Sequence, residues 1–202
     1  SAFVNDTKEL AKNDDTAGYV LAMPNDNGRV EALLALLTQH KVKYEVLNQD
    51  VKIEGVAFNA KQAIYIPVAQ PQYRLVKSLF STQTSFENNT FYDVSTWNLA
   101  LAFNLDYKNV DKRNARSIKT AANASLEKVA VADALPTAAY AYAFSWNDYY
   151  APALLQALLE NGVSVRSSEE GFSAMLTNGN VEHFDAGSII IPTGLAQPSE
   201  LV

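Results

Sequence analysis

The chain of 202 residues contains no cysteine. Disulfide bonds, thiolate nucleophiles and metal sites built on cysteine are therefore excluded. The same absence is compatible with the cytosol and with the periplasm, so it does not decide between these two compartments.

Histidine and glycine are scarce, with two and eight residues. Neither His40 nor His183 has Glu three or four positions later, which excludes the common helical zinc-binding pairs. The chain also has no Gly-x-Ser-x-Gly or Gly-x-Cys-x-Gly elbow, no phosphate loop and no dinucleotide-binding glycine turn. We therefore expect no catalytic residue, no metal ligand and no cofactor in this chain.

No apolar run approaches the roughly 18 residues that a membrane span requires. The net charge of -6 argues against a general nucleic-acid binder, because phosphate contacts require clustered Lys and Arg. The one basic cluster, at 108–119, is mixed with Asp111 and reads as a solvated connecting segment. The first ten residues have neither a basic start nor an apolar core, so we expect no signal peptide in this segment.

Apolar residues make up 48% of the chain and charged residues 19%, which is typical of a globular protein with a real core. The apolar run at 18–26 predicts a buried strand, and residues 42–47 and 63–69 predict two more. Helices are predicted by apolar residues at helical spacing over 28–42 and by a proline-led segment at 70–80. Asp26 or Asn27 is placed to cap the first of these helices.

The second half of the chain repeats this order. With a shift of 121, residues 140–163 match residues 19–42 at seven of 24 positions. After an insertion that carries an Asn178-Gly179 hairpin turn, the shift becomes 125 and SIIIP falls on AIYIP. In both halves the chain then continues to Ala-Gln-Pro. We interpret the pattern as an internal duplication, although two generic units of strand, helix and strand would also produce it.

Strands that alternate with helices are typical of parallel sheets. We therefore expect one α/β domain over residues 1–202, with a doubly wound, mostly parallel sheet and helices on both faces. Its similar halves lie at about 18–80 and 139–202, and the segment at 81–138 connects them. Within that segment, Asp93 or Ser95 is placed to cap a short helix, and residues 126–132 are expected to add a strand.

The carboxyl ends of parallel strands meet at one edge of a sheet, where ligands bind in open α/β folds. Several polar and aromatic side chains follow the predicted strands. The resulting candidates for ligand binding are Asn25, Asp26, Gln70, Trp146, Asn147, Asp148 and Gln197. The alternative for Asp26 and Asp148 is helix capping, and for Trp146 it is packing at the rim of the core.

Three stretches carry a resemblance to a known family. They are YVLAMPNDNGRVEALLALLTQHKVKYEV, AIYIPVAQPQYRLVKSLF and FYDVSTWNLALAFNLD. They resemble the C-terminal region of large bacterial zinc carboxypeptidases of the carboxypeptidase A-like metallopeptidase family, in which a class I glutamine amidotransferase-like domain follows the peptidase domain. The later stretches YAYAFSWNDYYAPALLQALLENGVSV and AGSIIIP also fit, so the resemblance spans about residues 18 to 198.

The resemblance implies a flavodoxin-like domain and a periplasmic or secreted parent protein that removes C-terminal residues from peptides with a zinc-bound water. The zinc ligands of that family have no match here and would lie upstream, and the cysteine nucleophile of amidotransferases is missing. The resemblance thus implies a non-catalytic accessory domain whose partner is the peptidase domain of the same chain. The chain also stops within the first turn of an expected helix after Pro198, and we expect it to be a fragment of that longer protein.

Two rival hypotheses remain. The first is an independent module that binds a small ligand or a peptide in the cleft at the strand ends. The second is a hydrolase with an unfamiliar site, such as Ser145 beside Asp148, which lacks a positioned base.

Overall fold

The computed structural model describes residues 2–82, 98–121, 124–128, 135–136 and 139–198. The chain divides into two compact units, which we call unit 1 (residues 1–129) and unit 2 (residues 130–202). In the part of the chain that is described, no helix is both long and apolar enough to cross a membrane.

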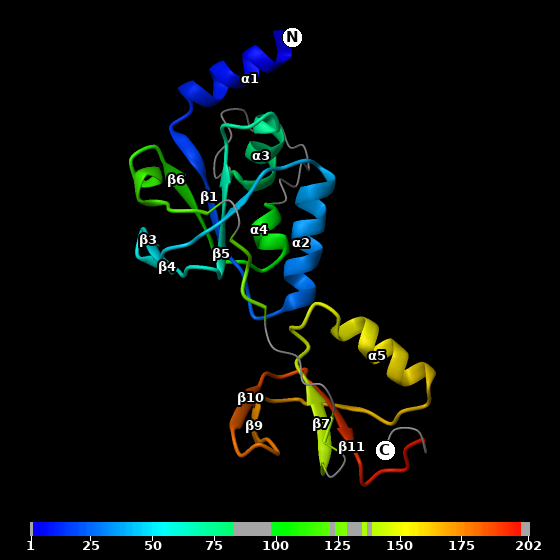
Figure 1. Cartoon of the computed structure of the whole chain (residues 1–202). Helices are drawn as coiled ribbons and strands as arrows, with labels where there is room; N and C mark the ends of the chain where they lie inside the picture. The colour runs from blue at the N-terminus through cyan, green and yellow to red at the C-terminus, as the bar shows by residue number, and fades with distance from the viewer. Residues whose placement is uncertain (1, 83–97, 122–123, 129–134, 137–138, 199–202) are drawn as a thin grey trace, which may run out of the picture. The chain divides into compact units, whose positions relative to one another are not determined.

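Unit 1 contains a four-stranded sheet with the strand order β2-β5-β1-β6, of which β5, β1 and β6 are labelled in Figure 1. Its strands are β1 (Thr16–Ala22), β2 (Glu45–Val46), β3 (Val51–Ile53), β4 (Val56–Phe58), β5 (Ala63–Pro67) and β6 (Tyr107–Asp111). Its helices are α1 (Ala2–Asn13), α2 (Asn27–Gln39), α3 (Tyr73–Phe80), α4 (Leu99–Ala102) and the 3-10 helix η1 (Asn114–Ser117). The helices predicted over 28–42 and 70–80 are therefore confirmed as α2 and α3.

The predicted flavodoxin-like, doubly wound parallel sheet is wrong. Strand β5 pairs antiparallel with both β1 and β2, and β6 pairs antiparallel with β1. The helix α2 does connect two strands that point the same way, β1 and β2, but β5 lies between them. The reason lies in the connection from β2 to β5, which is a β3–β4 hairpin instead of a helix. Adjacent parallel strands need a long crossover, and without one the returning strand pairs antiparallel.

The helices also do not cover both faces of the unit 1 sheet. On one face Tyr19, Leu21, Ile64 and Ile66 pack in one buried cluster with residues of α2, α3 and α4. On the other face Val20, Ala63 and Val110 pack with Ile53 and Phe58 of the β3–β4 hairpin, and Ala115 of η1 lies against them. The alternation along β1 and β5 therefore places one apolar set under helices and the other under a hairpin.

Unit 2 contains β7 (Ala141–Phe144), α5 (Ala151–Glu160), β8 (Arg166–Ser167), β9 (Phe172–Met175), β10 (Val181–Phe184) and β11 (Ile189–Pro192). Its three-stranded sheet has the order β7-β11-β8, and both pairings are antiparallel. The hairpin β9–β10, with its predicted turn at Asn178-Gly179, connects β8 to β11. Unit 2 therefore repeats the arrangement of β1, α2, β2, the β3–β4 hairpin and β5.

The strand registers relate the two units residue by residue. Ile64 lies between Val46 and Leu21 in unit 1, and Ile189 lies between Ser167 and Phe144 in unit 2. The second and last strands keep the sequence shifts of 121 and 125. The first strand is offset by 123, so Tyr142, and not Tyr140, stands where Tyr19 does.

The connecting segment is partly ordered into unit 1. The strand β6 extends the sheet where the sequence predicted only a solvated excursion, because Val110 points into the core between the polar residues Asn109 and Asp111. The predicted short helix exists as α4, and Asn98 caps it. The alternative caps Asp93 and Ser95 lie outside the described residues, as do most of the expected strand at 126–132 and the expected helix start after Pro198.

Candidate functional site

The chain turns from β1 into α2 through a short polar loop. The backbone N–H of Met23 donates to the Gln62 carbonyl over 2.8 Å, which holds the start of this loop against the strand β5. Asp26 then ends the loop as the N-cap of α2, and its Oδ1 accepts from the Arg29 N–H over 2.9 Å. The predicted cap is thereby confirmed, because an oxygen-bearing side chain satisfies a free N–H of the first turn.

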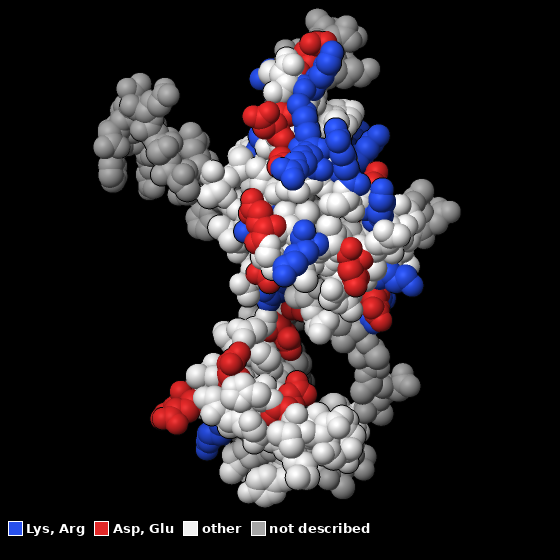
Figure 2. All heavy atoms as spheres, turned by 90° about the vertical axis from the view of Figure 1, so that its left-hand side faces the viewer, with Lys and Arg blue, Asp and Glu red and all other residues white. Residues whose placement is uncertain are grey.

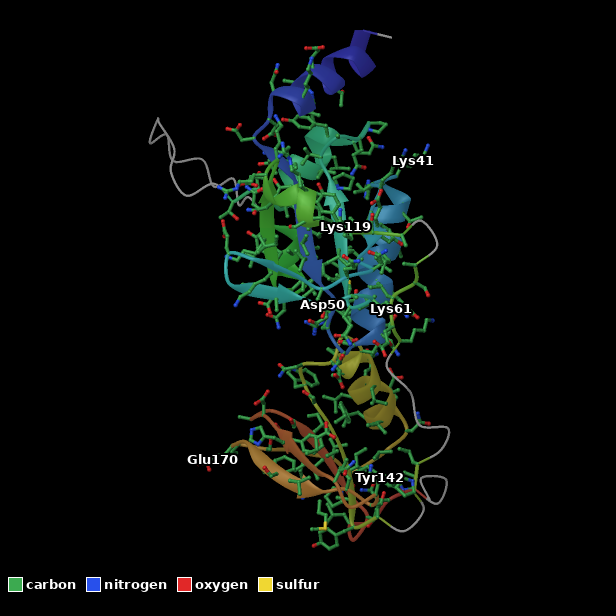
Figure 3. All side chains as sticks on the ribbon, turned by 60° about the vertical axis from the view of Figure 1, so that its left-hand side comes forward. Lys41, Asp50, Lys61, Lys119, Tyr142 and Glu170 are labelled. Atoms are coloured by element: carbon green, nitrogen blue, oxygen red, sulfur yellow. The ribbon has the colours of Figure 1, made fainter. Side chains whose placement is uncertain are left out.

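A cavity of about 630 Å³ opens beside this loop, within unit 1. One wall is the loop and the first two turns of α2, the second is the start of β2 and β5, and the third is the segment at 124–128. That third wall is fixed where the N–H of Glu127 donates to the carbonyl of Lys61, a residue labelled in Figure 3. The lining residues are Met23, Pro24, Asn25, Asn27, Val30, Glu31, Leu34, Tyr44, Val46, Gln62, Ala124, Ser125, Leu126, Glu127 and Lys128.

The cavity combines an apolar side with a polar one. Val30, Leu34 and Leu126 supply apolar contact surface, whereas amide and charged side chains supply hydrogen-bonding groups. Lys128 Nζ lies 3.5 Å from Glu31 Oε1, and Gln62 Nε2 donates to Glu127 Oε2 over 3.3 Å. Since the partner of Glu127 here is a neutral amide, these three charged groups leave one net negative charge at the cavity. Such a site suits a ligand with an apolar part and a cationic or neutral polar part.

The predicted site residues do not meet at one edge of a sheet. Asn25 and Asp26 follow β1, whereas Gln70 follows β5, and in the antiparallel pair Gly18 lies opposite Pro67. The loop of Asn25 and the loop of Gln70 therefore lie at opposite ends of these strands. Unit 2 shows the same separation between the residues after β7 and Gln197 after β11. Of the seven candidates, only Asn25 lines the cavity.

Gln70 and Gln197 perform the same structural task. Gln70 Oε1 accepts from the N–H of Lys43 over 2.7 Å, and its Nε2 donates to the carbonyls of Lys43 and Pro67. Gln197 makes the same three hydrogen bonds to Ser164 and Pro192. Each amide thus fixes the chain that enters the second strand against the end of the last strand. The sequence signal for this role was present in the repeated Ala-Gln-Pro.

Trp146, Asn147 and Asp148 form the turn between β7 and α5. Trp146 is 42% exposed. Asn147 Nδ2 donates to Asp185 Oδ2 over 2.9 Å, and the Asp148 carbonyl accepts from the Ala151 N–H at the start of α5. The turn therefore connects the end of β7 to the loop after β10 and to the start of the helix.

A second polar cluster lies at the opposite end of β1 and joins α3 to the sheet. Tyr73 donates its hydroxyl to Asp14 Oδ2 over 2.7 Å, and Lys77 Nζ lies 3.0 Å from the same carboxylate. Burial opposes the charge of Asp14, but the hydrogen bonds from Tyr73, Thr16 and Lys77 outweigh it and lower the pKa of Asp14. Burial and the nearby Asp14 carboxylate raise the pKa of Tyr73 to about 12. A smaller cavity of about 490 Å³ adjoins this cluster at Lys77.

Histidine, serine and aspartate also meet in unit 2, which the sequence did not indicate. Ser173 Oγ lies 3.3 Å from His183 Nδ1 across the β9–β10 hairpin, and His183 Nε2 lies 3.8 Å from Asp185 Oδ1. The second distance is too long for a hydrogen bond. The side chains of His183 and Asp185 are 64% and 66% exposed, so water surrounds the groups that would have to activate the serine. We assign no chemistry to this cluster.

Among the described residues, no group of three or more His, Asp or Glu side chains is arranged to hold a metal ion.

The comparisons with known proteins add no relative. No family model, no curated protein and no solved structure matches the chain.

Proposed function

We propose that this chain is a non-catalytic, peptide-binding accessory domain of a zinc metallocarboxypeptidase. The observation that carries the binding function is the cavity of about 630 Å³ at the start of α2. Its volume lies within the range of ordinary ligand sites. Its wall is mixed, with apolar side chains next to amides that both donate and accept hydrogen bonds.

The ligand class follows from this wall. A peptide backbone alternates donors and acceptors, which the amides of Asn25 and Gln62 match. One apolar side chain of the peptide would contact Val30, Leu34 and Leu126. A neighbouring Lys or Arg would lie near Glu127, whose carboxylate supplies the net negative charge of the cavity. We therefore expect preference for an apolar residue beside a basic one.

Binding of short peptides to the full 202-residue chain tests this function. Isothermal titration of an acetylated Leu-Lys peptide amide is expected to show binding, and the Leu-Glu peptide is expected to bind at least about tenfold more weakly. Glu127→Lys should weaken binding of the Leu-Lys peptide at least about tenfold. Glu170→Lys, the same charge reversal on the exposed surface of unit 2, is the matched control and should leave the affinity unchanged (Figure 3). Equal affinities for the two peptides, or for the two variants, would contradict the proposal.

The parent protein is a separate part of the proposal and depends on the quoted sequence motifs. The flavodoxin-like fold that the resemblance implied is not the fold of this chain, so the fold gives this part no support. Zinc would be held by the peptidase domain of the longer protein, which we expect in the periplasm or outside the cell. The full reading frame tests the parentage. A His-x-x-Glu pair with a later His is expected upstream, and an open reading frame without them would refute it.

A further inference from the structure

The helices α2 and α5 occupy equivalent places in the two units but differ in burial. Leu33 of α2 is fully buried, whereas its equivalent Leu154 of α5 is 45% exposed. Tyr150, one helical turn before Leu154, is 58% exposed, and Leu158, one turn after it, is half-buried. Leu154 and Leu158 share one face of α5 because they are four positions apart, and Tyr150, the N-cap residue, continues this face into an apolar stripe.

In unit 1 the equivalent face of α2 lies in the core. Leu33 and Leu37 belong to the same buried cluster as Val76 and Phe80, which come from α3, and Ala100 of α4 joins them. The helix α3 follows directly after the Gln70 clamp and Pro71. In unit 2 the Gln197 clamp is built in the same way and is also followed by proline. The two units therefore share the leucines that cluster with α3 residues in unit 1 and the Gln-Pro pair that precedes α3.

Charge indicates which kind of helix fits this surface. Unit 2 contains one basic residue, Arg166, against eight Asp and Glu residues. Figure 2 draws the face turned away from α5, and there Lys and Arg gather on unit 1, whereas the charged side chains of unit 2 are mainly Asp and Glu. The sequence of α3, YRLVKSLF, carries Arg74 and Lys77 and no acidic residue. A helix of this composition would be attracted to unit 2 and not only packed against it.

We propose that the apolar stripe of α5 binds a basic amphipathic helix of the α3 type. Its partner presents apolar residues at the spacing of Tyr73, Val76 and Phe80 to Leu154 and Tyr150, and basic residues on its outer side. The complex reproduces in unit 2 the apolar cluster that residues of α2 and α3 share in unit 1.

The probe is a fluorescently labelled peptide with the sequence of residues 70–82, held helical by a side-chain staple on its polar face. Its anisotropy is measured as the full chain is added. Binding is expected, with an affinity that falls as salt rises. Leu154→Asp should weaken binding at least about tenfold. Gln156→Asp places the same charge on the exposed opposite side of α5 and is the matched control, with no effect beyond about twofold.

Circular dichroism of both variants checks that α5 remains folded, which is expected because Leu154 is partly exposed already. The proposal is wrong if the peptide does not bind at about 1 mM chain, or if Leu154→Asp binds it as well as Gln156→Asp does. It is also wrong if sedimentation shows that the free chain dimerises and that Leu154→Asp abolishes the dimer, since a second copy would then be the occupant. A labelled peptide with Val76→Asp and Phe80→Asp serves as the negative probe.

Discussion

At the scale of single residues, Gln70 and Gln197 show how one amide can fix a connection between strands. Each side chain forms hydrogen bonds with one N–H and two carbonyls of the backbone. Gln70 is itself buried, so water cannot replace it. Such a residue is needed for stability, whatever the chain binds.

Replacement of this amide is therefore expected to affect folding and not ligand affinity. Gln70→Met keeps the length of the side chain but leaves the hydrogen-bonding groups of Lys43 and Pro67 without their partner. We expect a loss of about 2–4 kcal/mol in the free energy of unfolding, measured by urea denaturation. Gln72→Met, at an exposed hydrogen bond to the His40 carbonyl, should cost less than about 1 kcal/mol. Equal losses for the two variants would contradict the role assigned to Gln70.

The buried residue Tyr19 makes the stability of unit 1 depend on pH in the alkaline range. Its ring is 2% exposed, and burial, together with the Asp14 carboxylate, raises the pKa of Tyr19 to about 12. The folded protein thus holds this proton more tightly than the unfolded chain, whose tyrosines have the usual value of 10.0. The resulting stability is complete below pH 10 and is lost as the pH rises toward 12.

Tyr19→Phe removes this titration. The free energy of unfolding of the natural chain should fall between pH 9 and pH 11.5 by about 2 kcal/mol more than that of Tyr19→Phe. Urea denaturation at several pH values measures the difference. Tyr140→Phe is the control. Tyr140 is 92% exposed, so its replacement should leave the pH dependence of stability unchanged. If the free energy of unfolding fell equally with pH in Tyr19→Phe and in the natural chain, the raised pKa would not belong to Tyr19.

At the scale of the element, the two equivalent helices end in the same motif with different residues. The N–H of Val42 donates to the Leu37 carbonyl, and the N–H of Val163 donates to the Leu158 carbonyl. Both motifs need a residue with positive φ before the valine. Gly162 takes φ 73° there, whereas Lys41, labelled in Figure 3, takes φ 56°. A residue with a Cβ is disfavoured in this region, and glycine is not.

Lys41→Gly should therefore stabilise unit 1. We expect a gain of about 0.5–1 kcal/mol in the free energy of unfolding, since relief of strain exceeds the added entropy of the unfolded chain. Lys41→Ala removes the same charge but keeps a Cβ, so it should give no gain. Thermal and urea denaturation of the two variants distinguish backbone strain from charge, and a gain in Lys41→Ala equal to that of Lys41→Gly would favour charge.

Local signals predicted the elements of this chain better than their pairing. Apolar runs located β1 and β5, helical spacing located α2, Pro71 marked the start of α3, the internal repeat located α5, and the Asn178-Gly179 turn marked the β9–β10 hairpin. The direction of β5 depended on its connection, and the short β3–β4 hairpin around Gly55 was missed in the first half. Because this hairpin was missed, the sheet was predicted to be parallel although it is antiparallel.

The cavity was predictable only in part for a related reason. Asn25 was selected as a residue after a strand, and it lines the cavity. The opposite wall, at 124–128, comes from a segment about 100 positions later with no regular structure. Its position depends on a hydrogen bond from the Glu127 N–H to the Lys61 carbonyl, which leaves no pattern in the sequence. Sequence periodicity therefore does not predict the part of a site that depends on tertiary contacts of irregular segments.

At the scale of the whole molecule, the two units differ in core and in charge although they share an arrangement of strands. Among the described residues, the largest fully buried side chains all belong to unit 1. They are Tyr19, Phe58, Phe80, Leu21, Leu33, Leu37, Leu47, Ile53, Ile64, Ile66, Val20 and Val68. In the part of unit 2 that the structure describes, the buried apolar residues are Ala151, Val163, Phe184, Ile189 and Ile191, and none of these is fully enclosed. Burial of apolar surface is the dominant favourable term in folding, so unit 2 should be the less stable unit.

Native-state hydrogen exchange, read by mass spectrometry, measures this difference directly. Amides of β7 and β11 should exchange through openings that cost at least about 2 kcal/mol less than those of β1 and β5. Addition of the stapled α3 peptide should slow exchange in α5 and β11 and leave β1 unchanged, because ligand binding stabilises the unit that it contacts. A single free energy of opening shared by both units would mean that they unfold together, and the small core of unit 2 would then gain its stability from unit 1.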